Sequence, residues 1–367
     1  TGKVLLNFKA SSRPFKPTEE RSTQIVDRTE IVPHDVGWTT VICESPEVYL
    51  MELGEYQLFA VTEDTESLIG KLLFIGVDAP DFNLGLETQL KAAGVRTIHY
   101  VSPSIWAWRK GRLKGIARSV SHMLCLFPFE PPLYQAAGVP VSYVGHPLAD
   151  VFPLAPDRAA AREMLQIPGG VPVFALLPGS RQSEVRNLAD TYIATAAALH
   201  ERHPDACFLV PLATRETRLL FEEALRRHAN LDLPIRILFG HAVDAMIAAD
   251  AVLVASGTAT LEAALLKRPM VITYKMGKWS FRLMRRMAYL PWVGLPNVLA
   301  GREVVPEILQ DAATPQALAD ALDAWLTDKD KVADLTRSFT EMHLQLRQDT
   351  AARAAAAILP YLQGRGR

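Results

Sequence analysis

Short apolar runs alternate with amphipathic stretches along most of the chain after residue 71. The first four apolar runs cover residues 72–77, 96–101, 122–126 and 141–144. Apolar runs of this length, bounded by polar turns, are typical of buried strands. A helical stretch at residues 84–93 and a basic one after residue 108 lie between them. This repeated β-α order predicts a parallel sheet with helices on both faces.

A second β-α series follows a short, proline-bearing segment at residues 154–157. Its predicted strands are residues 173–177, 206–210, 235–239, 251–255 and 270–274. Because 367 residues are many for one hydrophobic core, we expect two doubly wound, Rossmann-like α/β domains. The expected domains are residues 1–153, completed by a C-terminal helix at about 342–367, and residues 154–341. Such sheets bind ligands beyond the carboxyl ends of their strands, which predicts a site in a cleft between the domains.

Residues 1–70 differ from the rest of the chain. They contain short β-like runs at residues 39–43, 48–51 and 56–61, separated by polar and proline-bearing stretches. No long amphipathic helix and no glycine-rich loop is recognisable among them. The pattern predicts strands in this region but indicates no function.

Composition and charge exclude several classes of protein. A hydrophobic content of 49% and a charged content of 22% are typical of a soluble globular chain. The formal net charge of −1 gives no general attraction to nucleic acid. Cys43, Cys125 and Cys207 are far apart, which predicts neither a disulfide framework nor a structural metal and fits a reducing cytosol. No apolar run approaches the ~20 residues of a membrane span, and the first residues lack the features of a signal peptide.

The most informative stretch is the apolar run at residues 173–177, which leads through Pro178-Gly179-Ser180 into a helix near Glu184. A strand that turns on small residues into a helix directs backbone N–H groups at a ligand above the sheet. The positive end of the helix dipole favours a phosphate there. Arg181 could clamp that phosphate through two hydrogen bonds. Taken by itself, the turn fits an ordinary β-α connection with a solvated arginine equally well.

A similar turn follows the apolar run at residues 251–255. There, Ser256, Gly257 and Thr258 precede a predicted helix that carries Glu262 one turn along. Two helix N-termini in one sheet can share a diphosphate, and Glu262 could accept hydrogen bonds from sugar hydroxyls. The alternative is that Thr258 is only an N-cap and Glu262 a favourable first-turn carboxylate. Because both turns belong to one predicted sheet, we favour the diphosphate interpretation.

Two carboxylates follow the predicted strand at residues 72–77. Asp78 stands at the strand end, where it could act as general base on an incoming hydroxyl, and we assign Asp81 to the N-cap of the next helix. No metal site is expected, because the Asp328-Lys-Asp330 pair lies in a hydrophilic turn. His146 is interpreted as a hinge residue at the domain border rather than a catalytic one.

Residues 274–292 form an unusual basic and aromatic stretch. Arranged as a helix, they place Trp279, Leu283 and Met287 on one side and Lys278, Arg282 and Arg285 on another. This pattern is typical of a helix on an anionic membrane surface, and a helix packed between domains would show it too. For Trp106 and Trp108, the sequence leaves open whether the side chains pack in the core or line a site for an amphiphile.

Together these motifs closely resemble those of the bacterial lipid-A-disaccharide synthase family. The likeness runs in order from about residue 74 to the C-terminus. The matching strings are Asp78-Ala-Pro-Asp-Phe-Asn83, Tyr100-Val-Ser-Pro-Ser-Ile-Trp-Ala-Trp-Arg109, Phe127-Pro-Phe-Glu130, Val144-Gly-His-Pro147, Leu177-Pro-Gly-Ser-Arg181, Ala255-Ser-Gly-Thr-Ala-Thr-Leu-Glu262 and Leu295-Pro-Asn-Val-Leu-Ala-Gly-Arg-Glu303.

The resemblance implies an inverting hexosyltransferase of the GT-B fold that uses neither a metal nor a cofactor. Such an enzyme joins UDP-2,3-diacylglucosamine to 2,3-diacylglucosamine 1-phosphate and releases UDP and lipid A disaccharide 1-phosphate. The resemblance further implies a cytoplasmic protein held peripherally at the inner membrane, without nucleic-acid partners and compatible with a homodimer.

The resemblance also implies roles for individual residues. The C-terminal domain would hold UDP, with Gly179, Ser180 and Arg181 at the diphosphate. Further contacts would come from Ser256, Gly257 and Thr258 to the same phosphates, from Glu262 to the ribose and from Asn297 to the nucleotide-sugar. Asp78 matches the aspartate proposed as the base on the acceptor hydroxyl.

The N-terminal region departs from the family pattern. The family opens with a Gly-Glu-Ala-Ser-Gly-Asp loop on the acceptor side, and residues 1–70 contain no such string. Two alternatives therefore accompany the expected enzyme. One is a UDP-sugar-binding protein of GT-B type that has lost transfer activity. The other is a different UDP-sugar enzyme, such as a peptidoglycan-precursor transferase or an epimerase.

Overall fold

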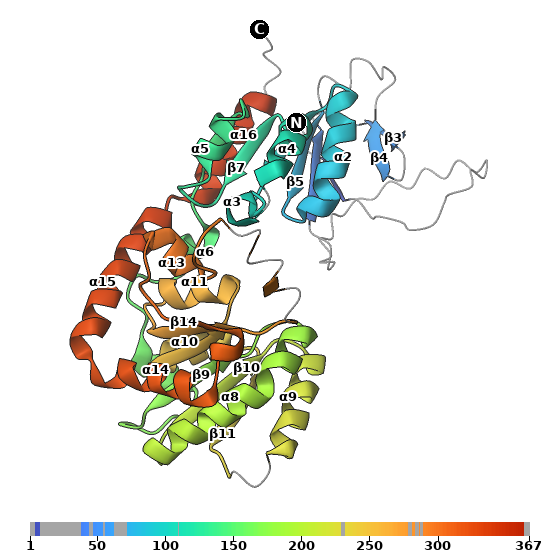
Figure 1. The fold of residues 1–367 in the computed structure, drawn as a ribbon. Helices are drawn as coiled ribbons and strands as arrows, with labels where there is room; N and C mark the ends of the chain where they lie inside the picture. Colours follow the sequence, from blue (N-terminus) through green and yellow to red (C-terminus); the bar gives the residue numbers. More distant parts are fainter. Residues whose placement is uncertain are drawn as a thin grey trace. The chain divides into compact units, whose positions relative to one another are not determined.

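The computed structural model describes residues 4–7, 38–43, 47–53, 56–61, 72–108, 110–228, 232–277, 281–282, 286 and 289–362. The chain divides into two compact units (Figure 1). The first contains the described residues up to His146 and those from Gln348 onward, and the second is Pro147–Arg347.

The first unit contains a six-stranded sheet in the order β1-β2-β5-β6-β7-β8. Its strands are β1 (Val4–Asn7), β2 (Trp38–Cys43), β5 (Leu73–Val77), β6 (Arg96–Tyr100), β7 (His122–Cys125) and β8 (Val141–Tyr143). The last four are parallel, as predicted, while β1 and β2 join antiparallel. β3 (Glu47–Leu53) and β4 (Tyr56–Val61) form a separate antiparallel pair. The strands predicted at residues 39–43, 48–51 and 56–61 are therefore confirmed.

Both faces of the parallel part of this sheet are covered. The helices of the unit are α2 (Pro80–Ala92), α3 (Ile105–Trp108), α4 (Leu113–Ser119), α5 (Pro131–Gln135) and α16 (Thr350–Leu362), with a 3-10 turn at Lys110–Arg112. Because successive strand residues point to opposite faces, Met123 of β7 packs with α2, α4 and α5, whereas Leu124 packs against α16. The C-terminal helix thus supplies one side of the core of the first unit.

The second unit contains a six-stranded sheet in the order β11-β10-β9-β12-β13-β14, and all its strands are parallel. The strands are β9 (Val173–Leu177), β10 (Cys207–Leu212), β11 (Ile235–Phe239), β12 (Ala251–Ala255), β13 (Met270–Tyr274) and β14 (Glu307–Leu309). The chain adds β10 and β11 on one side of β9 and then β12 to β14 on the other. The order of the strands therefore reverses between β9 and β12.

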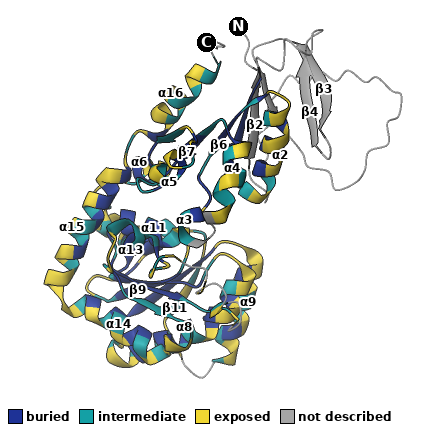
Figure 2. Ribbon diagram, turned by 45° about the horizontal axis from the view of Figure 1, so that its top comes forward, coloured by how far each residue is buried: buried dark blue, intermediate teal, exposed yellow. Residues whose placement is uncertain are grey.

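Helices cover both faces of the second sheet as well (Figure 1). They are α6 (Pro147–Val151), α7 (Arg158–Met164), α8 (Gln182–Arg202), α9 (Arg215–Arg227), α10 (Ala242–Ala248), α11 (Thr258–Leu265), α13 (Leu295–Ala300), α14 (Pro315–Thr327) and α15 (Lys329–Leu346). α8, α9 and α14 lie on one face, and α10 and α11 on the other. Every residue of β9 and β12 is buried (Figure 2). Two Rossmann-like α/β units are thus confirmed.

Part of the basic and aromatic stretch at residues 274–292, including Trp279, Leu283 and Arg285, lies outside the described residues. The structure therefore does not test the expected amphipathic helix. Among the helices that the structure describes, none combines the length and hydropathy of a membrane span.

Candidate functional site

The two small-residue corners of the second unit lie at the same edge of its sheet. Leu177 at the end of β9 pairs with Val254 near the end of β12. Gly179 and Gly257 therefore follow neighbouring strand ends, at the position where the strand order reverses. Ligands of doubly wound sheets bind at such a position.

A cavity of about 370 Å³ opens between these corners. Seven of the nine predicted site residues line it: Gly179, Ser180, Arg181, Ser256, Gly257, Thr258 and Glu262. The remaining lining residues are Leu177, Glu184, Pro211, Leu212, Ala213, Gly240, Ala242, Ala255 and Ala259. A cavity of this size fits part of a nucleotide-sized ligand.

Gly179 turns the chain at the first corner. Its φ of 117° lies in the left-handed region, where a side chain is strained. A Cβ at this position would lie 2.6 Å from Cβ of Glu184 on the first turn of α8. The conformation and the close approach of Glu184 both require glycine here.

Glu184 also closes the N-terminus of α8. Its Oε2 accepts hydrogen bonds from the backbone N–H of Ser180 at 3.1 Å and of Arg181 at 3.2 Å. The expectation that these two N–H groups are open to a ligand is therefore wrong. The carboxylate satisfies donors that the helix itself leaves unpaired, as in a capping box.

Arg181 keeps its side chain in solvent. The guanidinium is 80% exposed and lies 3.5 Å from Oε1 of Glu184, a weak surface contact. Since little holds this side chain in place, it is available to an anion in the cavity that it lines.

The second corner requires glycine for its backbone conformation. Gly257 has φ 156° and ψ −162°, a region essentially reserved for glycine, and no atom lies within 4 Å of an added Cβ. Gly257 is itself the N-cap of α11 and Thr258 is its first residue, so the alternative role of Thr258 as N-cap is wrong. No side chain caps this helix. Its first N–H groups lie at the cavity, where the helix dipole favours an anion.

Glu262 lies one turn into α11 and borders the same cavity. Burial raises the pKa of its carboxyl group above the usual range. A carboxylate oxygen at this cavity can accept a hydrogen bond, which suits a sugar hydroxyl.

Asn297 is not among the residues that line the cavity. The residue is fully buried, and its Nδ2 donates to the Val305 carbonyl at 2.9 Å and to Oε1 of Glu307 at 2.8 Å. Its Oδ1 accepts from the backbone N–H of Val304 and Val305. Its amide is thus occupied within the chain, and the expected contact with the nucleotide-sugar stays a prediction.

Glu307 connects this network to the second corner. Its two oxygens accept hydrogen bonds from the N–H groups of Val293 at 2.8 Å and Gly294 at 2.9 Å. The Val293 carbonyl in turn accepts a hydrogen bond from the Ser256 hydroxyl at 3.2 Å. Asn297 and Glu307 therefore hold the loop that positions Ser256.

Asp78 lies in the first unit, at the corner between β5 and α2. Its side chain is exposed, its φ is 52°, and the next residue, Ala79, also has a left-handed φ of 42°. Two consecutive non-glycine residues in this region store strain of the kind found at functional sites. The Asp78 N–H donates to the Tyr100 carbonyl at 2.8 Å, and the Asp78 carbonyl accepts from Nδ2 of the buried Asn83.

The assignment of Asp81 as a helix cap is wrong. α2 begins at Pro80 with Ala79 as its N-cap, since proline is favoured in the first helical turn. Asp81 lies inside that turn, where its exposed carboxylate accepts a hydrogen bond of 2.5 Å from Arg112.

The ring of Trp106 packs edge-on against Phe129, with ring centroids 5.1 Å apart, and against Phe127 at 6.5 Å. All three rings are half-buried, so the choice between a core role and an amphiphile site stays open. The side chain of Trp108 lies outside the described residues.

Some cavity residues were missed by sequence reasoning. Pro211 and Leu212 end β10, Ala213 follows it, and Gly240 follows β11. Their signal was their position at the ends of predicted strands, because carboxyl ends of parallel strands meet at one edge. The capping role of Glu184 was detectable from its spacing, three residues after the corner. Glu307 gave no local signal.

Across the described part of the chain, no group of three or more His, Cys, Asp or Glu residues is arranged to hold a metal ion.

Comparison with known proteins shows the family of the chain. The sequence model of a family described as lipid-A-disaccharide synthetase matches residues 68–359. This chain belongs to the lipid-A-disaccharide synthase family. A member from Aromatoleum aromaticum is 73% identical over 289 residues, covering 79% of this chain and 74% of its own. A member from Burkholderia pseudomallei is 54% identical over 329 residues, covering 90% of this chain and 82% of its own.

Solved structures show weaker similarity. Anabaena HepE in complex with UDP and glucose is 16% identical, with a TM-score of 0.47 over 78% of this chain and 77% of that one. WaaG, a glycosyltransferase involved in lipopolysaccharide biosynthesis, is 15% identical, with a TM-score of 0.46 over 75% of this chain and 80% of that one.

Family membership confirms the predicted enzyme class, a glycosyltransferase of lipid A biosynthesis. With the two Rossmann-like units, it also confirms the predicted GT-B fold class. Neither a binding protein without transfer activity nor a different UDP-sugar enzyme is favoured by identities of 50–73% to lipid-A-disaccharide synthases.

Proposed function

We propose that this lipid-A-disaccharide synthase joins UDP-2,3-diacylglucosamine to 2,3-diacylglucosamine 1-phosphate. The observation that supports the donor half is the meeting of two strand-to-helix corners at one cavity, at the reversal of strand order. The UDP-sugar-binding domain is then the second unit and the acceptor-side domain the first.

The diphosphate of UDP lies between the Gly179 and Gly257 corners. The uncapped N-terminus of α11 and the Ser256 and Thr258 hydroxyls meet it from one side. The Ser180 hydroxyl and the exposed guanidinium of Arg181 meet it from the other. Glu184 keeps the two corner N–H groups occupied, so Arg181 supplies most of the charge on that side.

The transfer is a single displacement with inversion at the sugar. The 6-hydroxyl oxygen of the acceptor forms a bond to the anomeric carbon while the bond from that carbon to the UDP oxygen breaks. Asp78 accepts the proton of the hydroxyl as general base. The departing electron pair stays on UDP, where Arg181 and the α11 N-terminus stabilise the growing negative charge.

Two further residues complete the donor site. Glu262 holds a ribose hydroxyl, which its position one turn into α11 at the same cavity suits. Asn297 acts as a positioning residue, because it supports, through Glu307, the loop that holds Ser256.

The acylated substrates also determine where the enzyme works. Both carry acyl chains that reside in a bilayer, and residues 274–292 are rich in basic and aromatic side chains. We therefore propose a cytoplasmic enzyme held peripherally at the inner membrane.

A coupled assay of UDP release tests this function. The purified chain is supplied with both diacylated sugars and, separately, with the same sugars lacking acyl chains. The expected result is UDP release and disaccharide formation with the acylated pair only. Turnover of non-acylated sugars would assign a different transferase, and UDP binding without turnover of either pair would assign a binding protein.

A further inference from the structure

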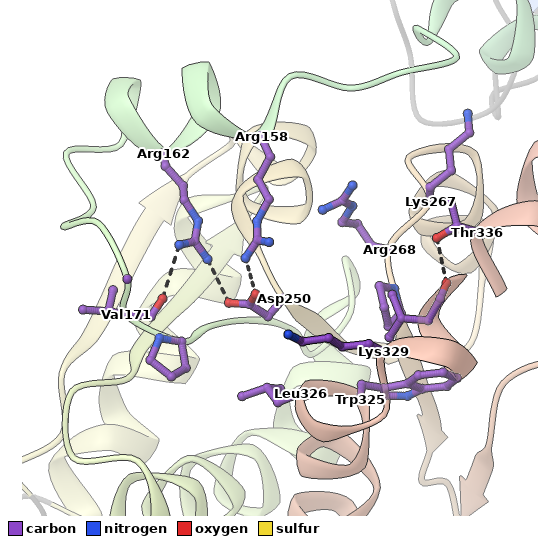
Figure 3. A pocket seen from close by; sticks show the side chains of 14 residues that line it. Arg158, Arg162, Val171, Asp250, Lys267, Arg268, Trp325, Leu326, Lys329 and Thr336 are labelled. Atoms are coloured by element: carbon purple, nitrogen blue, oxygen red, sulfur yellow. Dashed lines mark hydrogen bonds and ion pairs between the residues drawn. The ribbon is translucent and has the colours of Figure 1, made fainter. Parts of the chain in front are cut away.

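A second and larger cavity lies at the opposite edge of the same sheet. It has a volume of about 680 Å³ and is formed where β9, β12 and β13 begin, together with α7, the end of α14 and the start of α15 (Figure 3). All its lining residues belong to the second unit. Because parallel strands end at the other edge, this cavity is separate from the proposed UDP site.

Basic side chains dominate the lining. The cations are Arg158, Arg162, Lys267, Arg268 and Lys329, and Asp250 is the one carboxylate among the lining residues. Asp250 forms ion pairs with Arg158 and, at 2.8 Å, with Arg162 (Figure 3). Lys267 donates to the Leu265 carbonyl at 2.6 Å and contacts Nδ1 of His343. One carboxylate therefore faces three arginines and Lys329.

The C-terminal end of α10 compensates only part of the positive charge of the three arginines. Nε of Arg158 and of Arg162 both donate to the Ala248 carbonyl, and Arg268 donates to the carbonyls of Ile247 and Ala249 at 3.4 Å each. Cations are favourable at a helix C-terminus, but such an end carries only about half a negative charge. Asp250 and the helix end together leave more than one positive charge uncompensated.

Lys329 lies where a cation is unfavourable. It is the first residue of α15, next to the positive end of the helix dipole, and its side chain extends into the cavity (Figure 3). Within the part of the chain that the structure describes, its ammonium group has neither an ion pair nor a hydrogen bond. Because the Asp328 carboxylate already caps the α15 N-terminus by accepting a hydrogen bond from the Lys331 N–H, it is the ammonium group of Lys329 that favours an anion at this place.

The pKa of Arg268 reflects the same excess of positive charge. Its pKa is lowered to about 10, first by burial and then by repulsion from Arg158 and Arg162, which Asp250 only partly offsets. A bound anion would offset the repulsion from Arg158 and Arg162.

We propose that this pocket binds a phosphate-bearing anion. Guanidinium groups bind phosphate oxygens through paired hydrogen bonds, and several of them converge here with one ammonium group. The opposite wall is apolar, formed by Pro172, Trp325, Leu326 and Val332, and suits the organic part of a phosphate ester. The volume lies in the usual range for small-ligand sites. The phosphate comes either from a soluble phosphate ester or from a lipid headgroup.

The first test measures soluble phosphate. Pyrophosphate is titrated calorimetrically into the full-length chain in the presence of saturating UDP, which occupies the other phosphate site. We expect saturable binding to the wild-type chain, weakened at least about 10-fold in Lys329→Glu. Lys331→Glu is the matched control, since it makes the same charge change two residues along α15, over the Trp325 ring and outside the lining. Its affinity should stay within about twofold.

The second test measures lipid phosphate. Wild-type chain and both variants are sedimented with phosphatidylcholine vesicles that either contain or lack phosphatidic acid. Vesicle binding that falls in Lys329→Glu and not in Lys331→Glu supports the pocket with a headgroup as its ligand. Lys329-dependent pyrophosphate binding supports it with a soluble ligand. The proposal is overturned if neither probe shows binding that depends on Lys329. Glutamate is favourable in the first turn of a helix, which holds both Lys329 and Lys331, so both variants are expected to fold.

Discussion

The strand-to-helix corners at Asp78 and at Gly179 make the same kind of connection but place the left-handed backbone conformation on different residue types. Both turn a buried strand sharply into a helix, and both have a helical glutamate packed against a glycine, Glu87 on Gly76 and Glu184 on Gly179. In the first unit the left-handed conformation falls on Asp78 and Ala79. In the second unit it falls on Gly179, at no steric cost.

This difference determines what each corner presents to a ligand. Strain at Asp78 places a carboxylate at the end of the strand, while its own N–H is satisfied by the Tyr100 carbonyl. The Gly179 corner presents backbone, the Ser180 hydroxyl and Arg181. The first corner therefore suits proton transfer and the second suits anion binding, as a glycosyltransferase with a separate acceptor base requires.

The largest effect is expected from Asp78→Asn. The amide keeps the shape of the side chain and removes its basicity, so transfer should fall by about 10²–10⁴-fold. UDP affinity, measured by calorimetry, should stay nearly unchanged because Asp78 belongs to the other unit. Asp81→Asn, on the exposed first turn of α2, is the control and should retain activity within about twofold. Weakened UDP binding in Asp78→Asn would remove the distinction between the corners.

Arg181→Ala should lower turnover by at least about 100-fold, if a phosphate-clamping donor contributes about 3 kcal/mol to the transition state. The comparison variant is Arg186→Ala, on the same helix, where the arginine contacts Gln182. Near-normal turnover of Arg181→Ala in the UDP-release assay would refute the assigned role.

Replacement of the two glycines by alanine distinguishes steric from conformational demands. Gly257→Ala meets open space and only backbone strain, so the free energy of unfolding should fall by about 1–3 kcal/mol. Gly179→Ala should cost more, since its Cβ also collides with Glu184. Urea unfolding monitored by circular dichroism measures both. Equal losses would mean that Glu184 moves aside easily.

The smallest effect concerns Glu87, the buried counterpart of Glu184. Burial raises the pKa of Glu87, against the opposing hydrogen bond and charge of His99. The folded state therefore holds this proton more tightly than the unfolded state. This contribution to stability is fully present below the ordinary glutamate pKa and is lost as pH rises through the raised value. Glu87→Gln should remove that decline when urea midpoints are measured between about pH 4 and pH 8; an unchanged pH profile would contradict the assignment.

Local patterns were sufficient wherever one residue's neighbours in sequence determine its environment. The five apolar residues of β9 and of β12 were recognisable as buried strands, and small residues after each marked the corners. The start of α2 was predicted four residues too late, because Asp81 was taken for a cap when Pro80 already begins the helix.

Residues whose role depends on distant partners were less predictable. Asn297 lies in a family-like motif and was expected to touch the ligand, yet its amide is used by Val304, Val305 and Glu307. Glu307 begins an edge strand and resembles any surface glutamate in sequence. Its three hydrogen bonds arise only when the loop folds back onto it.

The sequence by itself determined the two β-α series, the glycine corners and the family, because strand burial, turn conformation and motif spacing are written into neighbouring residues. The tertiary structure decided which corners share one cavity, since strand order is set by long-range pairing. It also decided that the Asn297 amide bonds to Glu307 and to the backbone of Val304 and Val305, and that cations from α7, α15 and the strand starts gather at the opposite edge. Each of these depends on contacts between side chains that are distant in sequence, and only the packing of the folded chain determines which of them meet.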